Sequence, residues 1–376
     1  MENKYKSNNV ILLIGNGFDL AHGFRTSYTN FAEWFVTKIE KEIINYFDTR
    51  KTSILSKGFI FFLKDFKYVN NTQTDKITNI IKTYLGDYSK VALIETMNNN
   101  LHKIKGMISN DFLGKLYDNQ YKNWFDIENA YFQELIRLKG YFVDANNNPG
   151  FLKDIKKLNT ELTEIKEYLK EYLDSIEIKS NEEINGFFNT IKIFDNLDYN
   201  IFIINFNYTD TIEHYFSEFT EGGTNLKSVK INYIHGNLRE DNIIFGYGND
   251  KHKEYQKIKD LEENKFLENF KTFAYLKNNN YNKIYDDILD NNSIDEYIVF
   301  VLGHSLGATD KTLLEEVFNN AKCKKIHLFK RRNLKGNEEK LEKSFNNLVF
   351  SASRILRNEK DLRKKILNYE DSKYFP

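Results

Sequence analysis

VILLIGNGFDLAHGFR, residues 10–25, is the stretch that decides the fold class. Five apolar residues run without a charge into Gly-Asn-Gly. A short, continuous apolar run is typical of a strand buried on both faces of a parallel sheet. Glycines at the end of such a strand let the backbone turn tightly and bring N–H groups close to a phosphate. The stretch therefore predicts an α/β fold whose first strand leads into a phosphate-binding turn.

Further strand-like runs follow this first one along the chain. Four of them are clear, at Asn200–Ile204, Val229–Ile234, Tyr297–Leu302 and Lys325–Phe329, and Asn242–Phe245 is weaker. Helical segments separate most of them, which is the pattern of βαβ crossovers. We therefore expect a doubly wound, mainly parallel, Rossmann-like sheet.

About 185 residues with almost no strand pattern separate the first strand from the second. Apolar residues spaced by three and four from Leu152 to Ile176 predict one long helix. Trp124–Leu138 and Tyr28–Tyr46 are also expected to be helical, and Asn146–Gly150 to be a loop. The predicted organisation is a nucleotide-binding α/β domain at 1–50 and 190–376. A helical insertion at 51–189 and a smaller, polar one at about 250–292 interrupt it.

Charge points to no particular partner for the whole chain, because 54 Lys and Arg balance 54 Asp and Glu. The distribution is uneven, with 16 basic and 7 acidic residues from Lys322 to the C-terminus. This basic C-terminal region has two interpretations. It is either a surface that contacts a polyanion such as nucleic acid, or an ordinary solvated helical face.

A single cysteine, Cys323, excludes a disulfide framework and a multi-cysteine zinc site. The longest apolar runs are Phe59–Leu63 and Ile298–Leu302, far below the roughly 20 residues of a membrane span. Residues 1–9 are polar and do not resemble a signal peptide. We therefore expect a soluble, cytoplasmic protein without a membrane partner.

Polar residues follow the predicted strands at the ends where ligands bind in open α/β sheets. Asn207 follows the second strand, and His235 with Gly236 follows the third. Asp210 and Glu213 have the spacing of a helix N-cap and its reciprocal partner. Residues 245–250, which read FGYGND, are expected to form a flexible loop that lines the pocket.

The fourth strand is followed by Gly303-His304-Ser305-Leu306-Gly307, and then by Asp310 as a predicted helix cap. This spacing matches the Gly-x-Ser-x-Gly elbow of serine hydrolases. A triad would need an acid and then a histidine after Ser305, and the one histidine that follows is His327, inside a predicted strand.

Several blocks together resemble the AbiH family of bacterial abortive-infection proteins. They are GNGFDLAHGFRTSY, NWFDIENAYF, FNYTDTIEHYF, YIHGNL, FGYGND and GHSLGATD, in order along nearly the whole chain. The resemblance implies an antiviral protein that acts against phage.

A more distant similarity is to sirtuin-like domains. Gly15, Gly17 and Gly23 have the spacing of their glycine-rich opening. Asn207-Tyr208, His235-Gly236 and Gly303-x-Ser305 look like their later motifs. The similarity implies a doubly wound sheet with a pocket that hydrolyses NAD to nicotinamide and ADP-ribose. The chain lacks the four cysteines of sirtuin deacetylases, which disfavours deacetylation.

The resemblance implies roles for individual residues. The phosphate would be held by Gly15, Asn16, Gly17 and Gly23. Asp19 stands where the sirtuin motif has serine, and it would contact either ribose hydroxyls or a metal ion. Asn207 and His235 would be catalytic. Tyr208, Gly303, Ser305 and Asp310 would contact the nucleoside. Asp126, Glu128 and Tyr247 are expected to line or cover the pocket.

We thus expect a hydrolase that cleaves NAD or a related nucleotide at the N-glycosidic bond, without a resident metal. Two alternatives stay open. One is a module that senses a nucleotide or nucleic acid without catalysis, with the basic C-terminal region contacting nucleic acid or a phage component. The other is a serine hydrolase that uses Ser305. Homo-oligomerisation is left open as well.

Overall fold

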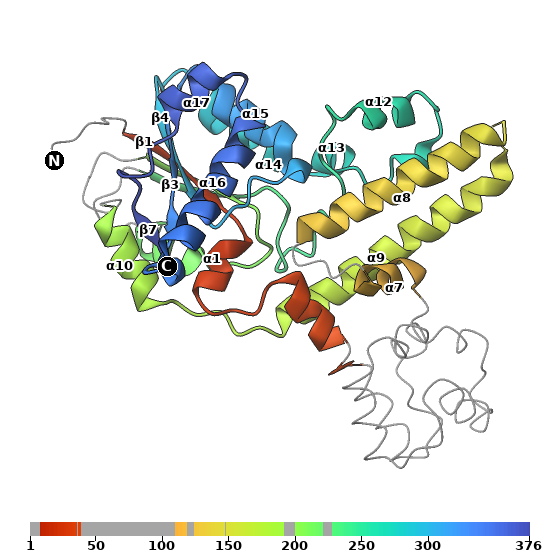
Figure 1. Ribbon diagram of the computed structural model, residues 1–376, viewed down its shortest axis with the longest axis horizontal. Helices are drawn as coiled ribbons and strands as arrows, with labels where there is room; N and C mark the ends of the chain where they lie inside the picture. The colour runs from red at the N-terminus through yellow and green to blue at the C-terminus, as the bar shows by residue number, and fades with distance from the viewer. Residues whose placement is uncertain are drawn as a thin grey trace, which may run out of the picture. The chain divides into compact units, whose positions relative to one another are not determined.

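The computed structural model describes residues 8–35, 37–38, 110–118, 124–146, 148–191, 200–220 and 228–376 (Figure 1). It divides into two compact units, Met1–Thr26 with Leu173–Pro376, and Ser27–Tyr172. We call the first the sheet unit and the second the helical unit. The assignment of 1–50 and 190–376 as a nucleotide-binding domain, interrupted by insertions, stays a prediction.

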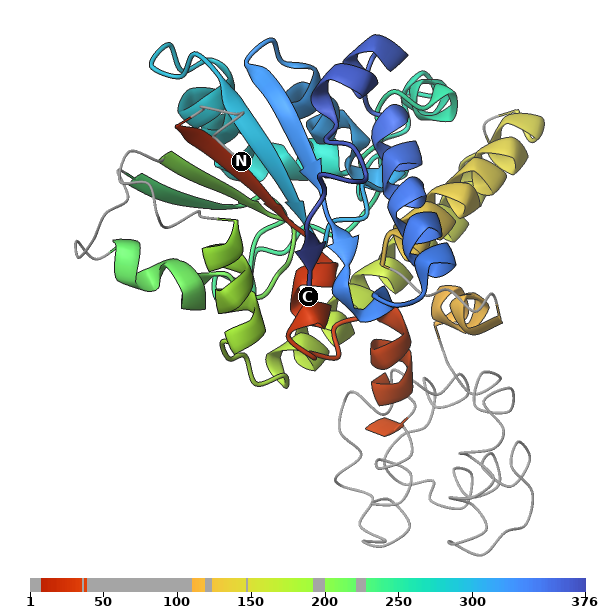
Figure 2. The same ribbon diagram turned by 60° about the vertical axis from the view of Figure 1, so that its left-hand side comes forward.

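Five parallel strands form the sheet of the sheet unit (Figure 2). They are β1 (Asn9–Ile14), β2 (Asn200–Asn205), β3 (Ser228–Tyr233), β4 (Tyr297–Leu302) and β5 (Cys323–Leu328). Their order in the sheet is β3-β2-β1-β4-β5, and β1 pairs in parallel with both β2 and β4. The predicted α/β fold with a mainly parallel sheet is confirmed. Because the strand order reverses between β1 and β4, their carboxyl ends mark the switch point at which such sheets bind ligands.

The two faces of the sheet carry separate cores because successive side chains of a strand point to opposite sides. Ile11 and Leu13 of β1 belong to one cluster of buried residues, and Val10, Leu12 and Ile14 to the other. The continuous apolar runs of the sequence are therefore required by burial on both faces. β3, at the edge of the sheet, is less buried than the central strands.

Helices cover both faces. The first cluster takes residues from α14, α15 and α16, and the second takes residues from α1, α10 and α11. The helices of the sheet unit are α1 (Asn16–Ala21), α10 (Glu182–Thr190), α11 (Glu213–Thr220), α12 (Lys253–Lys259), α13 (Lys271–Ala274), α14 (Asn280–Ile284), α15 (Lys311–Asn319), α16 (Glu338–Ser353) and α17 (Glu359–Lys365). Short 3₁₀ segments and one π-helical turn, Tyr285–Leu289, join them. The predicted helix-rich character of residues 250–292 is confirmed.

The weak sixth strand predicted at Asn242–Phe245 is wrong, since these residues form no strand. Their apolar side chains are buried for another reason: the segment folds back over the end of β3, and the Ile244 N–H donates to the His235 carbonyl (2.7 Å). The prediction also missed a pair of two-residue strands, β6 (Lys330–Arg331) and β7 (Tyr374–Phe375), which are too short for a pattern.

The helical unit contains α7 (Asp111–Asp118), α8 (Trp124–Asp144) and α9 (Leu152–Asp174), whose last two residues fall within the sheet unit. Both views show α8 and α9 side by side, and the Tyr131 hydroxyl on α8 donates to Asn159 on α9 (2.7 Å). The two long helices predicted here are confirmed. In the predicted Asn146–Gly150 loop, Asn146 and Asn148 lie outside helices, Pro149–Phe151 is a 3₁₀ helix, and position 147 lies outside the described residues. The predicted helix at 28–46 is helical at 28–35 and 37–38, and its remaining positions lie outside the described residues. Within the described ranges, no helix has the length and apolarity to cross a membrane.

Candidate functional site

The turns that follow β1 and β4 pack against each other backbone to backbone. The Gly15 N–H donates to the Leu302 carbonyl (3.0 Å), and the Gly17 N–H donates to the Gly303 carbonyl (2.8 Å). A Cβ atom on Gly17 would lie 2.7 Å from the Gly303 oxygen, and one on Gly303 would lie 2.1 Å from the Phe18 nitrogen. The structure therefore gives these glycines a packing role at the switch point. Their N–H groups would have to leave these bonds to hold a phosphate, and that role stays a prediction, as does the role of Asn16, the first residue of α1.

Gly23 ends α1 in the left-handed conformation (φ 83°), one residue after the C-cap His22. Glycine is favoured there because it adopts a positive φ without strain. His22 has both ring nitrogens bonded, Nδ1 to the Phe18 carbonyl (2.7 Å) and Nε2 to the Tyr215 hydroxyl (2.5 Å). It is a structural histidine that fastens the end of α1.

Asn207 ties the end of β2 to the turn after β1. Its side-chain amide donates to the Gly15 carbonyl (3.1 Å), and its own N–H donates to the Asn205 side chain (3.0 Å). The residue is buried. The predicted convergence of Asn207 with the glycine-rich turn is therefore present in the structure, and its predicted catalytic role stays a prediction.

Asp19 on α1 is a carboxylate with only 1% of its surface exposed. The Thr209 hydroxyl donates to its Oδ2 atom (2.7 Å), whereas Oδ1 has no hydrogen-bond partner among the described residues. Burial raises the pKa of Asp19 to about 6, although the side chains of Thr209, Thr211 and Asn207 oppose the rise. Its carboxyl group can therefore gain or lose a proton close to neutral pH.

Asp310 is the centre of a buried polar cluster. One of its oxygens lies 2.8 Å from Lys271 Nζ and 3.2 Å from His235 Nε2, and the other lies 3.5 Å from His304 Nε2. Lys271 is 1% exposed, and both histidines are buried. We call these four residues the Asp310 cluster. It joins the ends of β3 and β4 to α13.

Electrostatics within the Asp310 cluster favour an Asp310–Lys271 ion pair and lower the pKa of the neighbouring His235. Burial opposes ionisation of Asp310, but Lys271 and the histidines outweigh it and hold the pKa of Asp310 well below its usual range. Burial, and then the charge of Lys271, lower the pKa of His235 below its usual value. His304 accepts the Leu306 N–H at Nδ1 (3.0 Å), so its Nε2 carries the proton toward Asp310.

Aromatic rings hold the histidines in place. Phe206 meets His235 edge-on with ring centroids 5.3 Å apart, and its centroid is 4.2 Å from that of His304. Tyr275 stacks on His235, and its hydroxyl lies 3.1 Å from His235 Nε2. The Tyr208 hydroxyl donates to the Ile244 carbonyl (2.9 Å). These contacts position the rings before any ligand arrives.

Residues 245–250, expected to be flexible, are held by close contacts instead. Tyr247 pairs with the segment around Phe270: its N–H donates to Asn269 (3.1 Å), and its carbonyl accepts from Lys271 (2.9 Å). A Cβ atom on Gly246 would lie 2.1 Å from the Asn269 oxygen, so glycine is required for this approach. The loop thus positions the backbone of Lys271. Tyr247 is buried, and its predicted place in a pocket stays a prediction.

The capping role predicted for Asp210 and Glu213 is wrong, because α11 begins at Glu213 and Asp210 is therefore not at its N-cap position. The Arg239 guanidinium binds both carboxylates, at 2.8 and 3.0 Å. The Tyr233 hydroxyl donates to Glu213 as well (2.7 Å). The pair therefore fastens the loop after β3 to the start of α11.

Ser305 is exposed and makes no hydrogen bond within the described part of the chain. A hydrolase elbow strains the backbone of its serine. Here the positive φ angle belongs to Leu306 (56°), and residues 304–307 are irregular rather than turning directly into a helix. His327 lies within β5. The geometry does not favour a serine hydrolase.

Asp126 and Glu128 belong to α8 of the helical unit, where Glu128 is buried and Asp126 is half-buried. Trp124 packs against Tyr28 and Phe31, with ring centroids 5.5 and 5.3 Å apart. The role of Asp126 and Glu128 as lid or pocket residues stays a prediction. Across the described ranges, no group of three or more His, Cys, Asp and Glu side chains could hold a metal ion.

Many side chains of the basic C-terminal region are used inside the protein. Lys365 donates to the Phe318 carbonyl (2.7 Å), Lys373 to that of Thr190 (2.8 Å), and Lys322 to that of Asn291 (2.8 Å). Lys330 is buried and lies over the rings of Tyr369 and Tyr374. These contacts use part of the positive charge inside the protein, and a nucleic-acid surface formed by the other basic residues stays a prediction.

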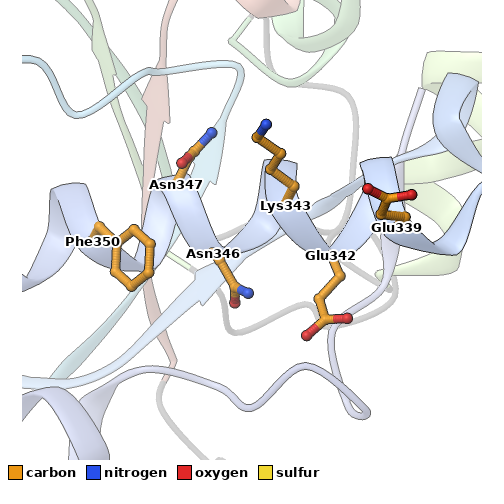
Figure 3. Close-up of a pocket in the computed structure, with 6 residues that line it drawn as sticks. All are labelled: Glu339, Glu342, Lys343, Asn346, Asn347 and Phe350. Atoms are coloured by element: carbon orange, nitrogen blue, oxygen red, sulfur yellow. The ribbon is translucent and has the colours of Figure 1, made fainter.

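A hollow of about 360 Å³ lies on α16 (Figure 3). All its lining residues belong to that helix, namely Glu339, Glu342, Lys343, Asn346, Asn347 and Phe350. The lining includes no histidine and no residue of the cluster, so it adds no chemistry to the site.

Three residues of the site were missed from the sequence. His304 could have been found, because it follows a strand in the same way as His235. Lys271 and Tyr275 lie in a segment that reads as a polar insertion. Nothing in its pattern separates a buried lysine from an exposed one.

Comparison with known proteins identifies the family. The family described as "Bacteriophage abortive infection AbiH" matches residues 11–331, which include β2 to β5, most of β1 and all members of the Asp310 cluster. Comparisons with curated proteins and with solved structures give no match. The chain belongs to the bacteriophage abortive infection AbiH family.

Proposed function

We propose that this protein is a hydrolase that cleaves NAD or a related nucleotide at its N-glycosidic bond, with His235 as the general base. Membership of the AbiH family implies antiphage abortive infection as the biological setting. The observation that carries the proposal is the pairing of His235 with Asp310 at the carboxyl edge of the sheet (3.2 Å).

The pairing leaves one nitrogen of His235 available for proton transfer. Asp310 is ionised and can only accept, so the Nε2 atom of His235 carries the proton between them. The Nδ1 atom then keeps its lone pair, and no described residue bonds to it. Water attacking the anomeric carbon would give its proton to Nδ1, while the departing base takes the electron pair of the broken C–N bond. Asp310 would stabilise the imidazolium that forms.

The reaction needs little else from the protein. Its oxocarbenium-like transition state is favoured by positioning and desolvation, and a general base adds about 10²–10⁴-fold. The aromatic contacts and the loop around Tyr247 supply the positioning. Asn207 would orient the ribose or the attacking water.

The test is purified full-length protein with NAD, following release of nicotinamide and ADP-ribose, alone and with phage components. We expect His235→Ala to lower kcat by about 10²–10⁴-fold. His22→Gln is the matched control, because both nitrogens of His22 are bonded within the fold, and it should keep the activity of the folded fraction. Wild-type protein that cleaves no nucleotide under either condition would refute the hydrolase, and binding without turnover would favour a sensing module.

The pH profile tests the same assignment. Because the pKa of His235 is lowered from its usual value of 6.5, His235 becomes protonated only at a more acidic pH than a free histidine does. The acid limb of the kcat/KM profile should therefore lie below pH 6.5. Lys271→Met removes the cation that helps to lower this pKa. The acid limb should then move to higher pH, and an unmoved limb would mean that another group is the base.

A further inference from the structure

Two residues that adjoin the Asp310 cluster each have a buried side-chain oxygen without a hydrogen-bond partner among the described residues. The oxygens are Asn249 Oδ1 and Thr309 Oγ1. Asn249 is 8% exposed and Thr309 is 1% exposed. A buried polar atom without a partner loses its hydration and gains nothing in return, so such atoms call for an explanation.

The two residues flank the place where the loop 245–250 touches the segment before α15. A Cβ atom on Gly248 would lie 2.2 Å from the Thr309 carbonyl and 3.0 Å from Lys271 Cδ. Thr309 directly precedes Asp310, and Asn249 directly follows Gly248. The backbone of both residues therefore lies close to Lys271 and Asp310.

The surrounding backbone is fixed. The Thr312 hydroxyl on α15 donates to Asp250 in the loop (2.6 Å) and lies 3.2 Å from the Gly248 carbonyl. These contacts leave Asn249 Oδ1 and Thr309 Oγ1 without a partner in the described part of the fold, so an external group that binds them must displace the loop.

We propose that Asn249 and Thr309 form a subsite for the nucleoside part of the ligand, where they bind a neutral group that carries an N–H or O–H. The inference rests on the proposed function, because it assigns ligand contacts within the same site. An amide oxygen can only accept, and a hydroxyl can accept and donate. The ligand group must therefore supply a donor, as the amide or amino group of a base and the hydroxyls of ribose do.

Phosphate fits this subsite poorly, because its oxygens are mainly acceptors and the Asn249 amide oxygen needs a donor. The N–H groups of Gly15 and Gly17 are also bonded within the protein. Asp19 Oδ1 is a further buried acceptor without a partner at the same edge of the sheet, among the described residues. The edge is therefore better suited to nucleoside recognition than to a phosphate cradle.

The first experiment needs no substrate. Thr309→Val keeps the side-chain shape and removes a hydroxyl without a partner, so the Tm of the unliganded protein should stay or rise by about 1–4 °C. Thr312→Val makes the same change at a bonded hydroxyl, and its Tm should fall. A fall for Thr309→Val as large as that for Thr312→Val would overturn the proposal, because the Thr309 hydroxyl would then have a partner in the fold.

The second experiment measures binding of adenosine, nicotinamide and inorganic phosphate by calorimetry. We expect adenosine or nicotinamide, but not phosphate, to bind wild type, and Thr309→Val to raise that Kd at least tenfold. The nucleoside or base that binds identifies the donor group. Absence of binding by both, or an unchanged Kd in Thr309→Val, would refute the subsite.

The two proposals fail in different ways. Adenosine or nicotinamide binding that depends on Thr309, without NAD cleavage, would retain the subsite and refute the hydrolase. NAD cleavage with an unchanged KM in Thr309→Val would retain the hydrolase and refute the subsite.

Discussion

Two buried carboxylates, Glu161 in the helical unit and Asp310 in the sheet unit, are used in opposite ways. Glu161 on α9 accepts the N–H groups of Asp111 (3.0 Å) and Phe112 (3.1 Å), and so caps the start of α7. Asp310 holds the N-cap position of α15 but makes no capping hydrogen bond. Its oxygens are turned toward Lys271 and two histidines instead.

The difference shows which of the two regions is specialised for chemistry. A carboxylate that caps a helix stabilises the fold directly, by about 1 kcal/mol in typical cases. At position 310 this contribution is given up, and a buried ion pair takes its place. Departures from the local rules of folding are expected at functional sites. In the helical unit, Glu161 and Asn110 follow those rules, because both accept N–H groups of the first turn of α7.

Removing the charge of Asp310 should have the largest effect on stability. Asp310→Asn leaves Lys271 buried without its counter-ion, and we expect a loss of about 3–5 kcal/mol in the free energy of unfolding. Glu161→Gln keeps one acceptor for the N–H groups of α7 and should cost about 1–2 kcal/mol. Urea denaturation of both variants gives the comparison. Equal losses would mean that the two carboxylates have the same structural role.

Glycine substitutions should sharpen the contrast between the regions. Gly303 has a φ of 71°, and Gly303→Ala would place a methyl group 2.1 Å from the Phe18 nitrogen. We expect a loss of about 3 kcal/mol in the free energy of unfolding. In α8 of the helical unit, a Cβ atom on Gly140 meets nothing within 4 Å. Gly140→Ala should therefore raise stability by about 0.5–1 kcal/mol. Thermal unfolding measures both, and a tolerated Gly303→Ala would contradict the packing of the two turns.

Asp19 should give an effect that depends on pH. Its folded pKa of about 6 is above the unfolded value of 3.8, so its contribution to stability is present at low pH and lost as the pH rises through 6. Asp19→Asn removes that loss, so at pH 8 the free energy of unfolding of the variant should be about 1–3 kcal/mol larger than that of wild type. At pH 4 the two should be similar. A difference that does not change with pH would show that Asp19 titrates normally.

Much of the fold could be predicted because burial leaves a periodic trace in the sequence. The five strands are confirmed within two residues. In β1, β2 and β4 the pattern is clear because strands buried on both faces are apolar at nearly every position. Leu158, Ile165 and Leu169 on α9 show the spacing of one buried helical face and are buried. The Asn242–Phe245 error has the same origin, because a buried loop can be as apolar as a strand.

The sequence alone determined the strands, the long helices, the glycine-rich turn and the placement of Asn207 and His235 after strands. Only the tertiary structure decided that the N–H groups of Gly15 and Gly17 are bonded to the turn after β4. It alone paired Asp310 with Lys271, 39 positions earlier in the chain. The physical reason is that local spacing reports which side of an element is buried. Which buried groups then meet depends on how separate strands and loops pack, and no local pattern encodes that.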